Sequence, residues 1–239
     1  SMPGIRPLLK LSYALNWAAS PSPRAFHAFN LAVHAINTLL AWALARHLLA
    51  RLAPALRPGR AAWFVALLFA LHPATTEAVT YVSGRSVSLM ALFYLAAMLA
   101  FLEGERRGRR WLSRAASPLL FALALGVRET ALTLPLALAL LAWFGGATPR
   151  ESLRGLGGHG LVLLLAALCA VLLPGYERFF AYSLGTRGFG EQLLAQAVAH
   201  AHLVGHSLLG LRNNLDPDLR VPAGLDVATA GALAAFAAA

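Results

Sequence analysis

The sequence predicts an all-α protein, a polytopic transmembrane helix bundle of about six to seven membrane segments. Of its 239 residues, 59% are hydrophobic and only 13% are charged, about half the charged fraction of an ordinary soluble domain. Apolar runs recur along nearly the whole chain, which excludes a single membrane anchor joined to a soluble domain. Basic residues lie in the short connections between these runs, as is typical of cytoplasmic loops in membrane proteins.

Polar connections divide the apolar sequence into successive segments. The predicted segments are 26–49, 61–71, 87–102, 118–127, 130–144 and 161–173, with a last one beginning near 228 and an amphipathic stretch at 192–211 before it. The second and fourth hold about a dozen residues, fewer than the roughly 20 that a perpendicular span needs. Such a helix still spans if it continues through the polar motif at its end, or where the bilayer thins or a water-filled cavity enters.

The connections between these segments alternate in charge. Those rich in Arg are 46–60, 103–114 and 145–157, and they alternate with the connections at 72–86, 128–130 and 174–222. If the Arg-rich loops are cytoplasmic, the other connections lie on the far side. We therefore expect an integral protein of the bacterial inner membrane with its site on the non-cytoplasmic face. Because the net charge of +10 gathers in these loops, it indicates contact with anionic lipid and not nucleic-acid binding.

Four polar side chains fall on one face of the first apolar segment. His27, Asn30, His34 and Asn37 are spaced three, four and three residues apart, which places them along one side of a helix. Polar groups are costly in lipid, so this face should meet protein or water. Hydrogen bonding between helices is the simpler interpretation, and direct contact with a substrate is the alternative. Because no acid stands nearby to complete a histidine site, we predict no metal.

A second polar block joins the end of one apolar segment to the start of the next. Glu77 follows His72 closely, and a carboxylate just outside a span can act as a base, pair with Arg or cap a helix. Arg85 comes directly after Ser83 and Gly84, where the next helix should begin. A helix N-terminus with an Arg suits a phosphate. A capped helix whose Arg extends to the membrane interface is an equal alternative.

Two charged residues interrupt the apolar run between 118 and 144. Arg128 and Glu129 are neighbours in sequence, and neighbours on a helix point apart. Each should therefore find its partner elsewhere, with Arg85 and Glu77 as the candidates. Ionisable residues at membrane depth usually mark a functional site.

Several of these blocks match a known pattern in the same order. They are Arg6-Pro7-Leu8 with Ser12 and Asn16, Phe26-His27 with Asn30 and His34, Phe69 to Val79 through His72 and Glu77, Val82 to Ser86, and Arg128 to Pro135. Together they resemble the transmembrane and tetratricopeptide-repeat O-mannosyltransferases and their bacterial relatives, of the GT-C type of membrane glycosyltransferase. The resemblance covers roughly residues 5–222.

The resemblance implies a function and a set of partners. Such enzymes move a sugar, typically mannose, from a polyprenyl-phosphate carrier to protein Ser or Thr outside the cytoplasm. The implied partners are the lipid-linked donor, a protein acceptor and the lipid bilayer. No cofactor is implied, and a divalent cation stays open as one. The implied site residues are the phosphate ligands Arg85 and Arg128, the carboxylates Glu77 and Glu129, and the cavity-lining residues His27, Asn30, His34 and His72.

The chain departs from the family pattern at its start. Relatives begin with one more helix and an outer loop whose acidic residues supply the catalytic base, whereas no acid precedes Glu77 here. Val87 stands where relatives are often acidic. We therefore expect a partial chain, with a GT-C-like transmembrane domain at 1–222 and a truncated further segment at 223–239. The alternative function is a non-catalytic GT-C-derived subunit of a larger membrane complex.

Overall fold

A computed structural model describes residues 6–144 and 155–172, together with a few separate residues between and after these ranges. The chain forms two compact units, residues 1–172 and 173–239, and the fold described here is that of the first. All regular structure in the described ranges is helical and none of it is strand. The all-α prediction is thus confirmed for this part of the chain. The predicted domain boundary at 222 and the segment beginning near 228 lie outside the described ranges.

The helices begin and end where the sequence chemistry favours it. Their bounds are α1 Pro7–Ala19, α2 Pro23–Leu52, α3 Pro58–Leu71, α4 Thr76–Thr80, α5 Arg85–Arg107, α6 Ser117–Val127, α7 Leu134–Phe144 and α9 Gly157–Leu172. Proline occupies the first helical position of α1, α2 and α3, where its missing N–H costs nothing. Helix α5 ends at Gly108, whose φ of 65° lies in the left-handed region that glycine adopts readily.

Short tight turns link these helices. They are the 3-10 turns η1 Pro54–Leu56, η2 Pro73–Thr75, η3 Val82–Gly84 and η5 Glu129–Thr133, and the π-helical turn η4 Leu112–Ala116. The stretch at 72–86, predicted as an irregular polar connection, is therefore built from η2, α4 and η3. Helix α1 was not among the predicted segments. Helix α4 lies within the predicted polar connection, and α7 begins at Leu134, after the predicted start at 130. The other described helices coincide with, or extend, the predicted apolar runs.

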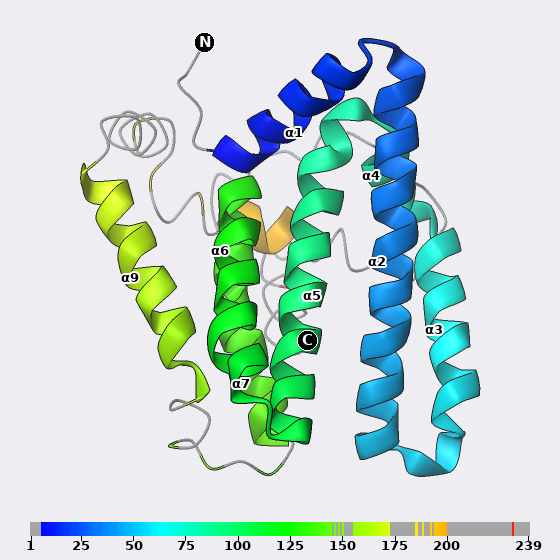
Figure 1. The fold of residues 1–239 in the computed structure, drawn as a ribbon, viewed down its shortest axis with the longest axis vertical. Coiled ribbons are helices and arrows are strands. Elements are labelled where there is room, and N and C mark those ends of the chain that lie inside the picture. Colours follow the sequence, from blue (N-terminus) through cyan, green and yellow to red (C-terminus); the bar gives the residue numbers. More distant parts are fainter. Residues whose placement is uncertain are drawn as a thin grey trace. The chain divides into compact units, whose positions relative to one another are not determined.

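Connections alternate between the two ends of this unit. Helix α2 packs against α3 and α5, α5 packs against α6, and α9 lies against α6. In Figure 1, helices α1 and α4, the start of α5 and the α6–α7 connection gather at one end, while the α2–α3 and α5–α6 connections lie at the other. The polar motifs of the described ranges thus share one end, and the Arg-rich α2–α3 and α5–α6 connections share the opposite end.

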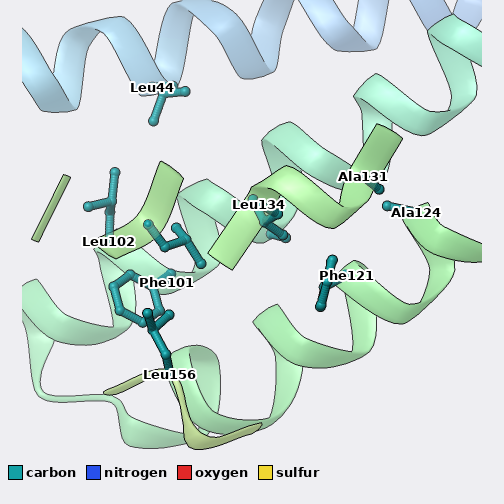
Figure 2. Packing of buried hydrophobic residues seen from close by; sticks show 10 residues of the cluster. Leu44, Phe101, Leu102, Phe121, Ala124, Ala131, Leu134 and Leu156 are labelled. Atoms are coloured by element: carbon teal, nitrogen blue, oxygen red, sulfur yellow. The ribbon is translucent and has the colours of Figure 1, made fainter. Parts of the chain in front are cut away.

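The core of the unit lies between α5, α6 and α7. Phe121, Leu134 and Leu138 are fully buried there. Leu44 from α2 and Leu156, which directly precedes α9, close the core (Figure 2). Ser117 Oγ donates a hydrogen bond of 2.8 Å to the Ala97 carbonyl, and Ser117 also lies 3.0 Å from His159 Nε2. These buried polar contacts tie α6 to α5 and α9 without leaving the hydroxyl unsatisfied.

Large apolar side chains cover much of the outer surface. They include Leu31, Leu39, Phe64, Leu68, Leu164 and Val171, all more than half exposed. Helix α2 and the helical stretch Val82–Arg107 are long and apolar enough to cross a membrane, and four further described helices are apolar but shorter. Exposed apolar surface on this scale marks contact with lipid or protein. These features favour a membrane protein, and the number of six to seven spans stays a prediction.

Candidate functional site

Arg85 is the centre of the polar end. Its guanidinium is fully buried and reaches from the first residue of α5 into the space between α1 and α2. Nε donates to Asn30 Oδ1 at 3.0 Å, Nη1 donates to the Ser12 carbonyl at 3.2 Å, and Nη2 donates to Asn16 Oδ1 at 2.6 Å and the Phe26 carbonyl at 3.4 Å. All three nitrogens are therefore engaged by protein oxygens.

Aromatic rings complete the surroundings of this guanidinium. Its central carbon lies 4.3 Å from the ring centre of Phe29, 4.5 Å from that of Tyr13 and 5.2 Å from that of Phe26. Such contacts are attractive because the ring face is negative. Tyr13 also donates from its hydroxyl to the Val82 carbonyl at 2.7 Å. Burial and full engagement keep Arg85 from a bound phosphate in this conformation, so the geometry gives it a positioning role.

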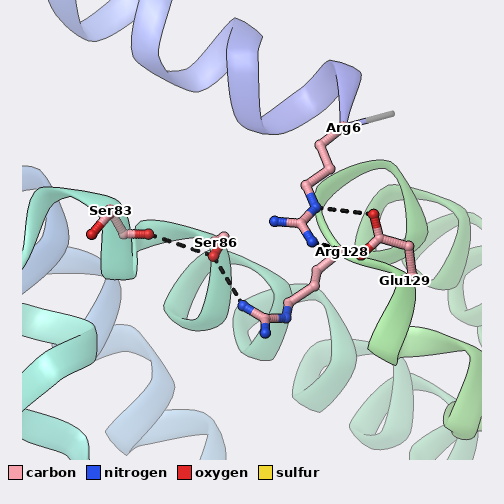
Figure 3. A network of polar contacts seen from close by, with 5 residues as sticks. All are labelled: Arg6, Ser83, Ser86, Arg128 and Glu129. Atoms are coloured by element: carbon pink, nitrogen blue, oxygen red, sulfur yellow. Dashed lines mark hydrogen bonds and ion pairs between the residues drawn. The ribbon is translucent and has the colours of Figure 1, made fainter. Parts of the chain in front are cut away.

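A more accessible ion pair lies beside the buried Arg85 and its partners. Arg6 precedes α1, and its Nε and Nη2 donate to the two carboxylate oxygens of Glu129 at 3.0 and 2.8 Å (Figure 3). The side chains are 39% and 41% exposed. Partial burial alone would raise the pKa of the Glu129 carboxyl, but the hydrogen bonds and charge of Arg6 outweigh it and hold that pKa below its ordinary value. The same hydrogen bond raises the pKa of Arg6, so both groups are charged at neutral pH.

Arg128 stands next to this ion pair without a carboxylate of its own. Its Nη1 donates to Ser86 Oγ at 3.2 Å, and the Ser86 hydroxyl lies 3.5 Å from the Ser83 carbonyl (Figure 3). Arg128 is half-buried, and no ion pair to a carboxylate is recorded for it among the described residues. The expected partners of the 128–129 pair were Arg85 and Glu77, and that expectation is wrong, because Ser86 and Arg6 occupy those places.

The four polar residues predicted on one face of α2, His27, Asn30, His34 and Asn37, differ in burial. Asn30 and Asn37 are buried and donate from Nδ2 to the carbonyls of Tyr81 and Ser88 at 3.1 and 2.8 Å. His34 Nε2 lies 3.2 Å from the Ala70 carbonyl. These contacts show the predicted hydrogen bonding between helices. His27 is exposed, so the four residues do not form one continuous lining, and substrate contact by these residues stays a prediction.

The two remaining predicted residues lie in the connection between α3 and α5. Glu77 is exposed in the first turn of α4, and its side chain has no hydrogen bond or ion pair among the described residues. His72 is half-buried at the C-terminal end of α3, where its carbonyl accepts a hydrogen bond of 2.7 Å from Thr75 Oγ1. Within the described ranges, no three His, Cys, Asp or Glu residues come together as a metal site would require.

Comparison with known proteins finds relatives of one kind. The chain is 34% identical to the Drosophila melanogaster Protein O-mannosyl-transferase Tmtc2 over 174 aligned residues. The alignment covers 70% of this chain and 17% of that protein. It is 36% identical to Mus musculus Protein O-mannosyl-transferase TMTC3 over 101 residues, or 42% and 10% of the two chains. It is 31% identical to the Homo sapiens TMTC3 protein over 131 residues, or 54% and 13% of the two chains.

The chain resembles the protein O-mannosyl-transferases. The resemblance predicted from the sequence motifs is thus confirmed. No family model and no solved structure matches the chain. The aligned part spans less than a fifth of the length of these O-mannosyl-transferases, so their whole activity comes to this chain only as a proposal.

The structure also adds residues that the sequence did not mark as site residues. Arg6 binds Glu129, while Ser12 and Asn16 supply two of the acceptors for Arg85. A signal was present, because all three belong to the opening motif shared with the O-mannosyl-transferases. The spacing of Ser12 and Asn16, four residues apart, also places them on one helix face. Tyr13, between them, carried no such signal.

Proposed function

We propose that this chain is the membrane part of a glycosyltransferase of GT-C type. It transfers a mannose-like sugar from a polyprenyl-phosphate donor to Ser or Thr of a protein acceptor. The end of the bundle that carries Arg128 and Glu129 faces the non-cytoplasmic side of the membrane, which in a bacterium is the inner membrane. The alternation of charged connections along the sequence and the O-mannosyl-transferase activity for which the relatives are named support this proposal.

One observation carries the proposal: a half-buried arginine without a carboxylate partner lies beside a completed ion pair. Arg6 and Arg128 contribute two positive charges near the single negative charge of Glu129. One positive charge is left for an anion. An arginine offers a planar fork of donors that fits phosphate oxygens. We assign phosphate binding to Arg128, with the Ser86 hydroxyl orienting it.

The buried contacts of Arg85 with α1 and α2 support the neighbouring site at Arg128. Arg85 joins α1 and α2 to the first turn of α5, and Ser86 follows it directly on that turn. The position of the Ser86 hydroxyl, and with it that of Arg128, therefore depends on Arg85. In this arrangement Arg85 is a positioning residue. Of the two phosphate contacts expected from the sequence, we retain the one with Arg128.

The transfer step can be written with these residues. The acceptor hydroxyl oxygen attacks the anomeric carbon of the sugar, the bond from that carbon to the phosphate oxygen breaks, and polyprenyl phosphate leaves with the electron pair. Arg128 stabilises the negative charge that grows on the leaving phosphate. The hydroxyl proton passes to a carboxylate. Among the described residues at this end, Glu77 is available for it, because Glu129 is held by Arg6.

A transfer assay with a matched arginine control tests the proposal. Membranes containing the protein receive labelled mannosyl-phosphoryl-polyprenol and a Ser/Thr-rich peptide, and labelled peptide is measured. We expect Arg128→Gln to lower transfer by about a hundredfold, as loss of a transition-state charge contact does. Arg24→Gln, an exposed arginine at the start of α2, should leave transfer unchanged. Equal transfer by the wild type and Arg128→Gln would refute the assignment.

A second function is favoured by one feature of the same end. Arg85 belongs to the most specific motif of the resemblance, and its guanidinium donates its hydrogen bonds to groups within the protein. A chain that keeps these motifs only to hold its helices together would be a non-catalytic subunit of a larger membrane complex. Wild-type protein that transfers no sugar but copurifies with a stoichiometric membrane partner would favour this alternative.

A further inference from the structure

A cavity lies at the end of the bundle opposite the polar site. Its volume is about 830 Å³, and it opens between the C-terminal halves of α2 and α5. The wall is largely apolar, formed by Trp42, Ala43, Leu99, Phe101, Leu102 and Ala142. The size lies within the range of sites that hold small organic ligands, about 300–1,000 Å³. Neither the motifs nor the transfer reaction uses this cavity.

Charged side chains surround the apolar wall. Glu103 forms ion pairs with two arginines, at 2.9 Å from Arg106 Nη2 and 2.6 Å from Arg107 Nε, and it also lies 3.4 Å from His47 Nδ1. The negative charge of Glu103 is therefore already paired with these arginines. The cavity lining holds three arginines, Arg46, Arg51 and Arg106, against the two carboxylates Glu103 and Glu105. No ion pair joins Arg46 to a carboxylate in the part of the chain that the structure describes. A cation in this setting favours an anionic ligand.

The ring of Trp42 packs against Arg46 in the cavity wall. The Arg46 guanidinium carbon lies 5.1 Å from the centre of the Trp42 ring, so the two side chains form one unit in the cavity wall. Trp42 Nε1 is buried and has no hydrogen-bond acceptor among the described residues. A buried donor without a partner is costly and uncommon. Because this nitrogen has almost no accessible surface, a molecule in the cavity contacts the Trp42 ring and Arg46 and does not reach the N–H.

We propose that this cavity binds an anionic phospholipid from the membrane leaflet at the Arg-rich end. The phosphate oxygens accept from Arg46, and one acyl chain runs along the apolar wall. Basic pockets between membrane helices bind lipid head groups in this way. A free phosphate ion would use the same donors but leave the apolar wall empty. The proposal does not depend on the transferase activity.

Lipid binding to the intact purified protein tests this. The protein is delipidated in detergent and titrated with phosphatidylglycerol or phosphatidylcholine, and bound lipid is measured by native mass spectrometry. We expect phosphatidylglycerol to bind the wild type more tightly than phosphatidylcholine. Arg46→Gln should weaken the binding of phosphatidylglycerol about fivefold, the effect of one basic residue at a lipid surface.

The control variant is Arg60→Gln, which removes an exposed arginine at the same end but outside the cavity lining. It should bind phosphatidylglycerol as the wild type does. Equal binding of the two lipids, or an equal loss in Arg60→Gln and Arg46→Gln, would show a general surface charge effect and overturn the proposal. Displacement of phosphatidylglycerol by millimolar inorganic phosphate would overturn the lipid as occupant. Because Arg46 is exposed on α2, its replacement should leave folding intact.

Discussion

At the scale of single residues, Arg85 shows how a buried positive charge is tolerated without a carboxylate. Removing a guanidinium from water is costly, and the cost is offset here by four protein oxygens and three aromatic rings. Because these groups come from α1 and α2, and Arg85 itself begins α5, the guanidinium ties three helices together. Its contribution is to the fold first, and to the neighbouring site through Ser86.

Replacing Arg85 should therefore be severe. Arg85→Met leaves the buried oxygens of Asn16, Asn30 and Ser12 without donors, and we expect the free energy of unfolding to fall by about 3 kcal/mol or more. Thermal unfolding in detergent measures this as a lower Tm. Arg85→Lys should recover only part of the loss, since an ammonium lacks the planar fork. Arg24→Met, at an exposed position, is the control, and an equal loss there would contradict the prediction.

The ion pair between Arg6 and Glu129 should contribute much less. Both side chains are about two-fifths exposed, so solvent screens them, and a double-mutant cycle with Arg6→Gln and Glu129→Gln should give a coupling energy below about 1 kcal/mol. Because the folded-state pKa of Glu129 is lowered, this contribution is present at neutral pH and is lost as the pH falls through that lowered pKa. Unfolding of the wild type and Glu129→Gln at pH 7 and pH 3 measures it. A coupling that grows at pH 3 would have the wrong sign.

At the scale of elements, the connection between α3 and α5 depends on close backbone approach. The position that a Cβ would take on Gly84 meets the Glu77 carbonyl oxygen and lies 2.9 Å from Ala78 Cα. Side chains of any size are therefore excluded there. This approach lets α4 fold back on the first turn of α5, where Arg85 and Ser86 begin.

Gly84→Ala should disturb this connection. The added methyl group meets backbone, which cannot move aside easily, so we expect a loss of about 1–3 kcal/mol in unfolding free energy. Gly59→Ala is the matched control, because a Cβ at Gly59 meets nothing within 4 Å and alanine is the better helix former. Denaturant unfolding of both variants measures the difference. Similar stabilities for the two variants would count against the close approach.

The sequence predicted some elements better than others for physical reasons. Helix α2 and the helix at 87–102 stand out because their apolar runs are long and continuous. Helix α1 was missed because Lys10, Ser12 and Asn16 interrupt its apolar pattern. The direction of the Arg85 side chain could not be read from spacing, since inward and outward orientations share one sequence. The partner of Glu129 lies 123 residues away, and no local pattern indicates such a pair.

At the scale of the whole molecule, charge is sorted between the two ends of the described unit. The Arg-rich α2–α3 and α5–α6 connections lie at one end, and the start of α5 and the α6–α7 connection, which carry Arg85, Arg128 and Glu129, lie at the other (Figure 1). Exposed leucines and aromatic side chains cover the surface between them. If the unit spans a membrane, this sorting fixes its orientation by the positive-inside rule.

Labelling of single cysteines tests that orientation. Cys169 is the one cysteine of the chain, and Cys169→Ser gives a background without thiols. In spheroplasts we expect an impermeant maleimide to label Ser83→Cys, at the end with the polar site, and to label Arg109→Cys only after the membrane is opened. Both positions are exposed. The reverse pattern would place the site on the cytoplasmic side and contradict the topology.

The most direct measurement of the central proposal is equilibrium binding of mannosyl-phosphoryl-polyprenol to the purified protein. We expect the wild type to bind the donor and Arg128→Gln to bind it about tenfold more weakly, as loss of one charged hydrogen-bond donor implies. Arg24→Gln should match the wild type. Equal donor affinity for Arg128→Gln and the wild type would show that the arginine beside the Arg6–Glu129 pair does not hold the phosphate.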